Sequence, residues 1–174
     1  MIVEATSQER LSITDQMVEW CDGHARAMCA GAKTKSFKHD CLQSHDVYLI
    51  GKIGELAVHL WLRSLGIKII HKPFRRSYAY FDTKDDFIVE GYGGQYQLEV
   101  RTKARSVDMQ PHYECCTDCI KPHLTYVFVN YNRAAHTTEI VGFADEELMR
   151  ANVRPVLKGA GNCNFAHKAN EYNI

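Results

Sequence analysis

Two acidic residues in the middle of the chain have the types and spacing needed to bind a divalent cation. Asp86 precedes the apolar run Phe87-Ile-Val89, and Glu99 lies within residues 95–103, where polar and apolar residues alternate. The turn-forming sequence Gly91-Tyr-Gly-Gly94 predicts that the two segments pair as a β-hairpin. Because paired strands lie only about 4.8 Å apart, both carboxylates are expected to converge across the hairpin. They would supply hard oxygen ligands of the kind that Mg²⁺ prefers.

Two basic residues are predicted to share a strand face with Glu99. In an alternating strand, residues two apart point the same way, so Glu99, Arg101 and Lys103 should lie on one side of the sheet. A cation at such a position can hold a scissile phosphate or orient an attacking water. Glu55, on a preceding helix, could complete the ligands of a metal or hold a water beside it. The chemistry indicated is metal-assisted phosphodiester hydrolysis.

Basic residues near these acids could hold a nucleic-acid backbone on either side of the cut. Lysine and arginine number 21, and aspartate and glutamate also number 21, so the chain as a whole has no basic excess. Affinity for nucleic acid must therefore come from local patches. The candidates are Lys72, Arg75, Arg76 and Arg105.

The elements that must position these residues follow from hydrophobic periodicity. Apolar residues at helical spacing predict a helix over about 47–65, with Gly66 as its stop and Glu55 beside its buried stripe. A second helix is predicted over about 13–30. Strands are predicted at 67–70, 87–89, 95–103, 124–131 and 138–143, with a short helix over 144–150. Residues 105–123 and the tail from 151 show no clear pattern.

The chain is expected to form one α/β domain. Its 174 residues are 45% hydrophobic and 24% charged, which suits a single globular core. We expect a mixed sheet of about four or five strands flanked by the two helices. Residues 1–46 would form an N-terminal helical segment, 47–150 the core and 151–174 a C-terminal tail.

Three motifs together resemble the PD-(D/E)XK nuclease superfamily, whose fold is restriction-endonuclease-like. Gly54-Glu55 on an apolar helix, Asp86 before a hydrophobic strand, and Leu98-Glu-Val-Arg-Thr-Lys103 are similar in order and spacing to the family's helix, first acid and (D/E)XK strand. Strands 126–129 and 139–143, followed by Glu146-Glu-Leu148, extend the resemblance over roughly 47–150. The similarity is to small members found in phages and restriction systems.

The resemblance implies an endonuclease that depends on Mg²⁺ or Mn²⁺ and acts on double-stranded DNA. Asp86, Glu99 and the Val100 carbonyl would hold the metal, with Glu55 assisting. A symmetric homodimer would suit cleavage of both strands of a palindromic site, but no residues specify its interface.

One position departs from the family pattern. The lysine expected two residues after the second acid is Arg101 here, which stays protonated and cannot act as a general base, although it can clamp a phosphate. Lys103 could take the lysine's part from the next position on the same face. Alternatively, the fold is catalytically inactive and serves as a nucleic-acid-binding or regulatory protein. An RNA-cleaving enzyme on the same scaffold is a further alternative.

The seven cysteines are an odd number and form no evident disulfide framework. Cys116 and Cys119 have the spacing of half a zinc knuckle, and Cys163 with His167 could supply a second half. Structural zinc and free thiols both remain open, and the lack of a second CxxC motif favours thiols.

No stretch approaches the roughly 20 apolar residues that span a bilayer, and the N-terminus lacks signal-peptide features. We therefore expect no membrane association. The predicted location is the cytoplasm, or that of a host cell if the protein is phage-encoded.

Overall fold

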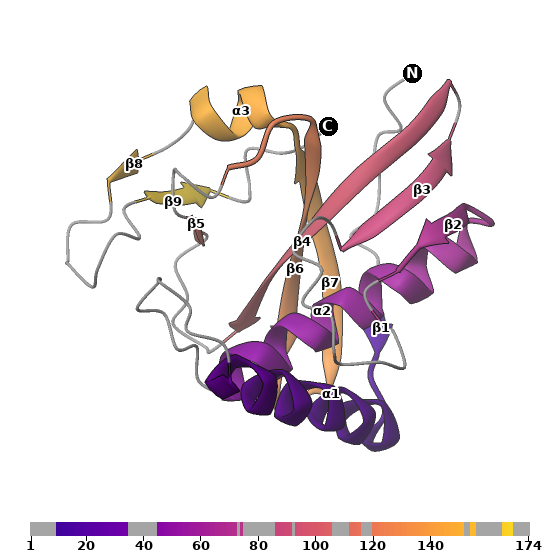
Figure 1. Cartoon of the computed structure of the whole chain (residues 1–174), viewed down its shortest axis with the longest axis vertical. Helices are drawn as coiled ribbons and strands as arrows, with labels where there is room; N and C mark the ends of the chain where they lie inside the picture. The colour runs from indigo at the N-terminus through magenta and orange to yellow at the C-terminus, as the bar shows by residue number, and fades with distance from the viewer. Residues whose placement is uncertain are drawn as a thin grey trace.

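The computed structural model describes residues 10–34, 45–72, 74, 86–91, 93–105, 112–115, 120–151, 154–155 and 165–168. Over these residues the chain forms a single α/β domain, with two N-terminal helices and a mixed, strongly curled sheet that resembles half a barrel (Figure 1). This confirms the expected class of fold, a mixed sheet flanked by helices.

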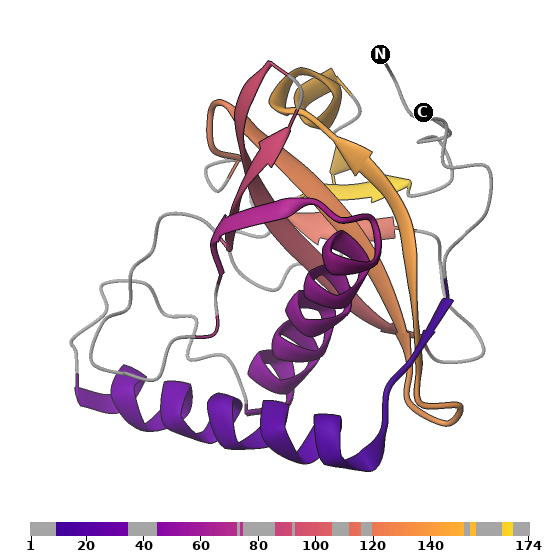
Figure 2. The same ribbon diagram turned by 90° about the vertical axis from the view of Figure 1, so that its right-hand side faces the viewer.

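The two helices lie close to where their periodicity predicted them. Helix α1 (Asp15–Thr34) begins after Thr14, whose Oγ1 accepts a hydrogen bond from a main-chain N–H in the first turn. Helix α2 (His45–Ser64) is followed by Gly66, which has a φ of 70° and ends the helix as expected. Figure 2 shows α2 inside the curl of the sheet, with α1 running across α2. In the part of the chain that the structure describes, no helix is both long and apolar enough to cross a membrane.

The main sheet has six strands rather than four or five. Its order is β1-β7-β6-β4-β3-β2, and β4 and β6 are the parallel pair in it. The additional strand, β1, has three residues, too few to show an alternating pattern. The bounds are β1 (Arg10–Ser12), β2 (Lys68–His71), β3 (Phe87–Gly91), β4 (Gly94–Arg105), β6 (Leu124–Asn132) and β7 (Thr137–Ala144).

Two regions predicted to lack regular structure contain short strands. Strand β5 (His112–Cys115) lies within 105–123, and β8 (Arg154–Pro155) and β9 (Phe165–Lys168) lie in the C-terminal tail. They form a separate three-stranded sheet in the order β5-β9-β8. Strands of two to four residues carry no readable period, which is why the prediction for these regions was wrong. Helix α3 (Glu146–Ala151) agrees with the predicted short helix.

Strand β6 runs through the centre of the sheet and supports a core on each face. Val127 and Val129 pack toward α2 with Phe87 of β3. On the other face, Tyr126 and Phe128 pack with the α3 side of the molecule. A strand buried on both faces reads as a continuous apolar run, as 124–131 does in the sequence.

Helix α2 and strand β4 approach each other very closely at Gly54. A Cβ atom at this position would lie 1.7 Å from Oγ1 of Thr102, so only glycine allows this packing. The contact fixes the distance between helix and strand, and it brings the next residue, Glu55, beside β4. Glycine is needed here for close packing and not for an unusual backbone conformation.

The Gly54 contact predicts a stability effect opposite to that of helix propensity. Alanine favours a helix by about 1 kcal/mol over glycine, yet Gly54→Ala should lower the free energy of unfolding by about 1–3 kcal/mol because the helix must move off Thr102. Urea unfolding measures the change. Gly51→Ala is the matched control on the same helix, since its Cβ would meet nothing within 4 Å. Equal effects of the two substitutions would contradict the close contact.

Candidate active site

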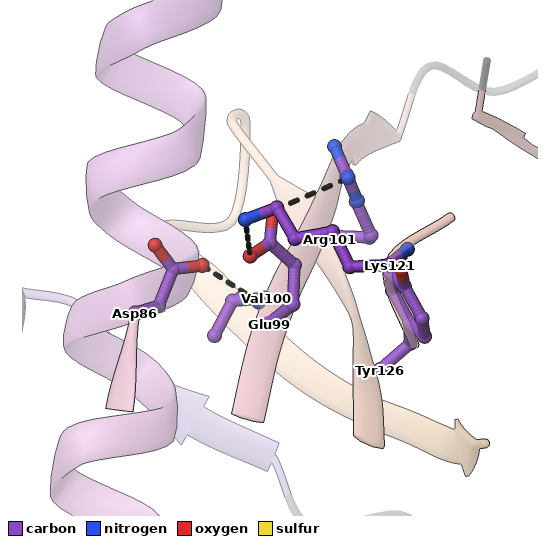
Figure 3. A network of polar contacts seen from close by, with 6 residues as sticks. All are labelled: Asp86, Glu99, Val100, Arg101, Lys121 and Tyr126. Carbon is purple, nitrogen blue, oxygen red and sulfur yellow. Dashed lines mark hydrogen bonds and ion pairs between the residues drawn. The ribbon is translucent and has the colours of Figure 1, made fainter. Parts of the chain in front are cut away.

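The β3–β4 hairpin brings Asp86 to the middle of β4, as the sequence predicted. Phe87 pairs with Leu98, so Asp86 lies where the next pair along would form. The N–H of Val100 donates a hydrogen bond to Oδ2 of Asp86 at 2.7 Å (Figure 3). Since N–H and C=O of one strand residue point to the same side, the Val100 carbonyl also faces the edge where Asp86 lies. Asp86, Val100 and the neighbouring Glu99 are thus adjacent.

Strand β4 extends well beyond its partner β3 at this point. Its pairing with β3 ends at Leu98, whereas the strand continues to Arg105. The Asp86 carboxylate accepts the hydrogen bond of the Val100 N–H, which lies just past the last β3–β4 pair and would otherwise lack a partner in β3. A short acidic side chain suits this role. Helix α2 contacts the extension at Thr102, and the charge of Asp86 acts on Glu55 of that helix.

Two cations hold the carboxylate of Glu99. Arg101 Nη2 lies 3.2 Å from Oε1, and Lys121 Nζ lies 3.1 Å from Oε2. The Arg101 guanidinium also lies over the ring of Tyr126, 5.8 Å from its centroid, and Figure 3 shows the group together. Glu99 and Tyr126 are register partners on β4 and β6, so these side chains share the sheet face opposite α2.

Glu55 is buried on α2 and paired with Lys52, one turn earlier. Lys52 Nζ donates to Oε2 of Glu55 at 2.5 Å, and the ammonium lies 5.6 Å from the centroid of the Phe74 ring. Both side chains are almost completely removed from water, and charged groups are rarely buried so deeply without a partner. The pair therefore places a carboxyl group and an ammonium group side by side on the inner side of β4.

Burial and the neighbouring acids favour the protonated form of the Glu55 carboxyl. Burial raises the pKa of its carboxyl from 4.5 to about 8, and the charge of Asp86, and less strongly that of Glu99, adds to the shift although Lys52 opposes it. The order of these effects shows that Asp86 acts on Glu55 more strongly than Glu99 does.

Asp86 experiences the same crowding. Burial and the charge of Glu99 raise its pKa from 3.8 to about 6, while the Val100 N–H and the charges of Lys52 and Arg101 act in the opposite direction. Burial is the largest cause of both shifts and the charge of nearby acids adds to it, so the site has too little positive charge to keep these buried carboxyl groups ionised. A divalent cation would supply it, which is the observation that makes this donor set suitable for a metal.

The carboxylates alone are too few to form a complete metal site. Among the residues that the structure describes, no group of three or more His, Cys, Asp and Glu side chains could hold a metal ion. A site here would combine the carboxylates of Asp86 and Glu99 with the Val100 carbonyl, all hard oxygen donors that suit Mg²⁺ or Mn²⁺. Water would occupy other positions, as is usual for Mg²⁺.

Several predicted residues lie apart from this group. Lys103 is two residues farther along β4 on the face of Arg101. Lys72 is exposed after β2. Burial and then the charges of Lys72 and Arg63 lower the pKa of His59. The role of Lys72 in gripping nucleic acid stays a prediction.

Other predicted residues lie outside the described part of the chain. The backbone, and with it the side chain, is undescribed for Arg75, Arg76, Cys116, Cys119 and Cys163. The side chains of Arg105 and His167 are likewise outside it, although their backbones belong to β4 and β9. The zinc hypothesis therefore stays a prediction. Of the cysteines that are described, Cys21 and Cys29 have free thiols.

Two cations of the site were missed by sequence reasoning. Lys52 precedes Glu55 by three residues, a spacing that places both on one helix face and could have been used. Lys121 lies 22 residues from Glu99 and follows an unpatterned segment. Its approach depends on the parallel pairing of β4 and β6, for which the sequence carries no local signal.

Comparison with known proteins adds no assignment. The sequence matches no family model, and no match was found among curated proteins or solved structures. A functional hypothesis for this chain therefore depends on its motifs and on the geometry of the site.

The raised pKa values predict that the fold loses stability as the pH rises. The folded-state pKa of Glu55, about 8, exceeds its ordinary value of 4.5, so the stabilisation is fully present below pH 4.5 and is lost as the pH rises through about 8. Asp86 contributes with the same sign, up to about pH 6. The free energy of unfolding can be measured with denaturant at one pH below 4.5 and at another above 8. Its decrease between the two pH values should be smaller in Glu55→Gln than in the native protein.

The exposed Glu147 of α3 provides a control for this experiment. Glu147→Gln should keep the pH dependence of the native protein, because that side chain is not buried. An unchanged pH dependence in Glu55→Gln would show that Glu55 is not the group responsible.

Proposed function

We propose that this protein is a metal-dependent endonuclease that hydrolyses phosphodiester bonds of double-stranded DNA, built on a restriction-endonuclease-like fold. The hydrogen bond from the Val100 N–H to Asp86 is the observation that carries the proposal. It holds the first acid of the motif against the strand that bears the second acid, Glu99. Two carboxylates and a main-chain carbonyl at one strand edge are suitable ligands for Mg²⁺ or Mn²⁺.

The order of elements supports the finer assignment of the fold. Helix α2 with Gly54-Glu55 is followed by β2, by the β3–β4 hairpin with both acids, and by β6 parallel to β4. Gly54 also has a physical role in this arrangement, since its contact with Thr102 brings Glu55 to the site. The motif residues are therefore linked by packing as well as by sequence order.

In the proposed mechanism, Asp86, Glu99 and the Val100 carbonyl hold the cation, and Glu55 assists from α2. The bound ion would polarise a phosphoryl oxygen and lower the pKa of the attacking water. Arg101 presents a planar guanidinium to the same region and can clamp two phosphate oxygens as negative charge develops. Lys103, farther along the same face, extends the positive charge along the DNA backbone.

The reaction is an ordinary hydrolysis and needs no oxidant or second substrate. A new bond forms between the water oxygen and phosphorus while the bond from phosphorus to one sugar oxygen breaks. The water loses one proton to solvent, and the leaving sugar oxygen takes up one proton from solvent. The products are a phosphate monoester and a free hydroxyl.

Cleavage of a supercoiled plasmid in Mg²⁺ tests the proposal. The native chain should nick or linearise the plasmid, chelation with EDTA should stop it, and Asp86→Asn or Glu99→Gln should each reduce the rate by about 100-fold or more. Glu90→Gln is the matched control, because Glu90 lies on the same hairpin but is exposed and paired with Lys68. Its rate should equal that of the native chain.

The other outcomes distinguish the alternatives. Equal cleavage by the native chain and both acid variants would refute the assignment of the site. Binding of DNA without cleavage would favour the catalytically inactive nucleic-acid-binding or regulatory protein. Faster cleavage of an RNA oligonucleotide than of DNA of the same sequence would favour the RNA-cleaving alternative.

A further inference from the structure

A lysine that lies outside β4 contacts Glu99, one of the two acids proposed to bind the metal. Lys121 precedes β6, and its Nζ lies 3.1 Å from Oε2 of Glu99. Arg101 occupies the other oxygen, Oε1, from the position where the family pattern has lysine. We propose that Lys121 supplies the lysine function of the site and contacts the scissile phosphate. This inference rests on the proposed nuclease function.

The backbone around Lys121 is held in place from two sides. The main-chain N–H of Lys121 donates a hydrogen bond to Oη of Tyr126 at 2.7 Å. The preceding carbonyl, that of the buried Ile120, accepts a hydrogen bond from Arg150 of α3 at 3.0 Å. Arg150 is itself held by an ion pair with Glu146 in the same helix. The backbone from which the Lys121 side chain extends is therefore held by β6 and by α3.

Exposure and chemistry both suit Lys121 for contact with a substrate. Its side chain is 39% exposed, whereas that of Glu99 is 14% exposed, so a ligand in solvent can reach the lysine more readily than the acid. An ammonium has three donors, and it can hold Glu99 with one and a phosphate oxygen with another. In Figure 3 Lys121 and Arg101 both approach Glu99. A phosphate bound beside Glu99 would meet both cations.

The two basic residues of the motif strand are less suited to this role. Arg101 is always protonated and lies over the Tyr126 ring, which suits it to clamp a phosphate from one side. Lys103 begins two residues farther along β4, about 7 Å from the position of Arg101 at the usual rise of a strand. Lys121, by contrast, lies within hydrogen-bonding distance of Glu99.

Binding of the divalent cation would change the partners of Lys121. Without the ion, Lys121 and Arg101 neutralise Glu99. If Glu99 held a divalent cation, its attraction for Lys121 would be weaker, and the Lys121 ammonium would be available to the phosphate. The same lysine thus stabilises the acid in the resting site and the substrate in the loaded site.

Plasmid cleavage by four lysine variants of the full chain tests this inference. Lys121→Met should reduce the rate by about 100-fold, whereas Lys121→Arg, which keeps the charge, should stay within about 10-fold of the native rate. Lys103→Met should lose less activity than Lys121→Met. Lys68→Met is the matched control, since Lys68 also forms an ion pair with a glutamate but lies on β2, and it should cleave at the native rate.

Calorimetric titration with Mn²⁺ gives a second readout that does not depend on cleavage. Because Lys121 competes with the metal for Glu99, Lys121→Met should bind Mn²⁺ at least as tightly as the native chain. Weaker Mn²⁺ binding would mean that Lys121 serves the metal site and would overturn the phosphate role. Unfolding curves check that the variant is folded.

The outcomes separate this inference from the proposed function. If the native chain cleaves and Glu99→Gln does not, but Lys121→Met cleaves normally, the nuclease function stands and the role of Lys121 is refuted. Equal losses in Lys121→Arg and Lys121→Met would also refute it, because charge alone should suffice. Absence of cleavage by the native chain would overturn both proposals together.

Discussion

The burial of acidic side chains close to one another is the constraint around which this site is arranged. Glu55 comes from a helix, Asp86 from the start of one strand and Glu99 from the middle of another. Burial raises the pKa of Glu55 and of Asp86, the charge of Glu99 adds to both shifts, and that of Asp86 adds to the shift of Glu55. The close contact at Gly54 prevents α2 from moving away, and the Val100 N–H fixes Asp86 at the strand edge. Three cations from different segments offset the charge: Lys52, Arg101 and Lys121.

Such an arrangement costs stability and is easier to understand as preparation for a ligand. A buried glutamate with a pKa of about 8 is less favourable for the fold than a neutral side chain at alkaline pH. A divalent cation would remove that cost by neutralising the acids together, so binding energy and folding energy are linked. Sites that trade stability for function are common in enzymes. A site that gains stability from a divalent cation is what the proposed nuclease requires.

Local patterns predicted the parts of the fold that depend on neighbouring residues. The stripe of α2, the turn between β3 and β4, and the alternation along β4 each extend over enough residues to show a period. These three patterns led to the prediction that Glu55 and Asp86 lie near Glu99. Strand β1 and the small sheet were missed because their strands are too short, and Lys121 was missed because its contact depends on long-range pairing of β4 with β6. Sequence periodicity carries no information on such pairing.

The most direct measurement is a crystal structure of the native protein soaked in Mn²⁺, with anomalous scattering used to locate the ion. Our account predicts one peak at the edge of β4, bounded by the carboxylates of Asp86 and Glu99 and the carbonyl of Val100, with oxygen ligands at about 2.0–2.2 Å. Glu99 should then have exchanged at least one of its two cationic partners for the metal. Both acids well ordered in the soaked crystal with no peak between them would contradict the central claim.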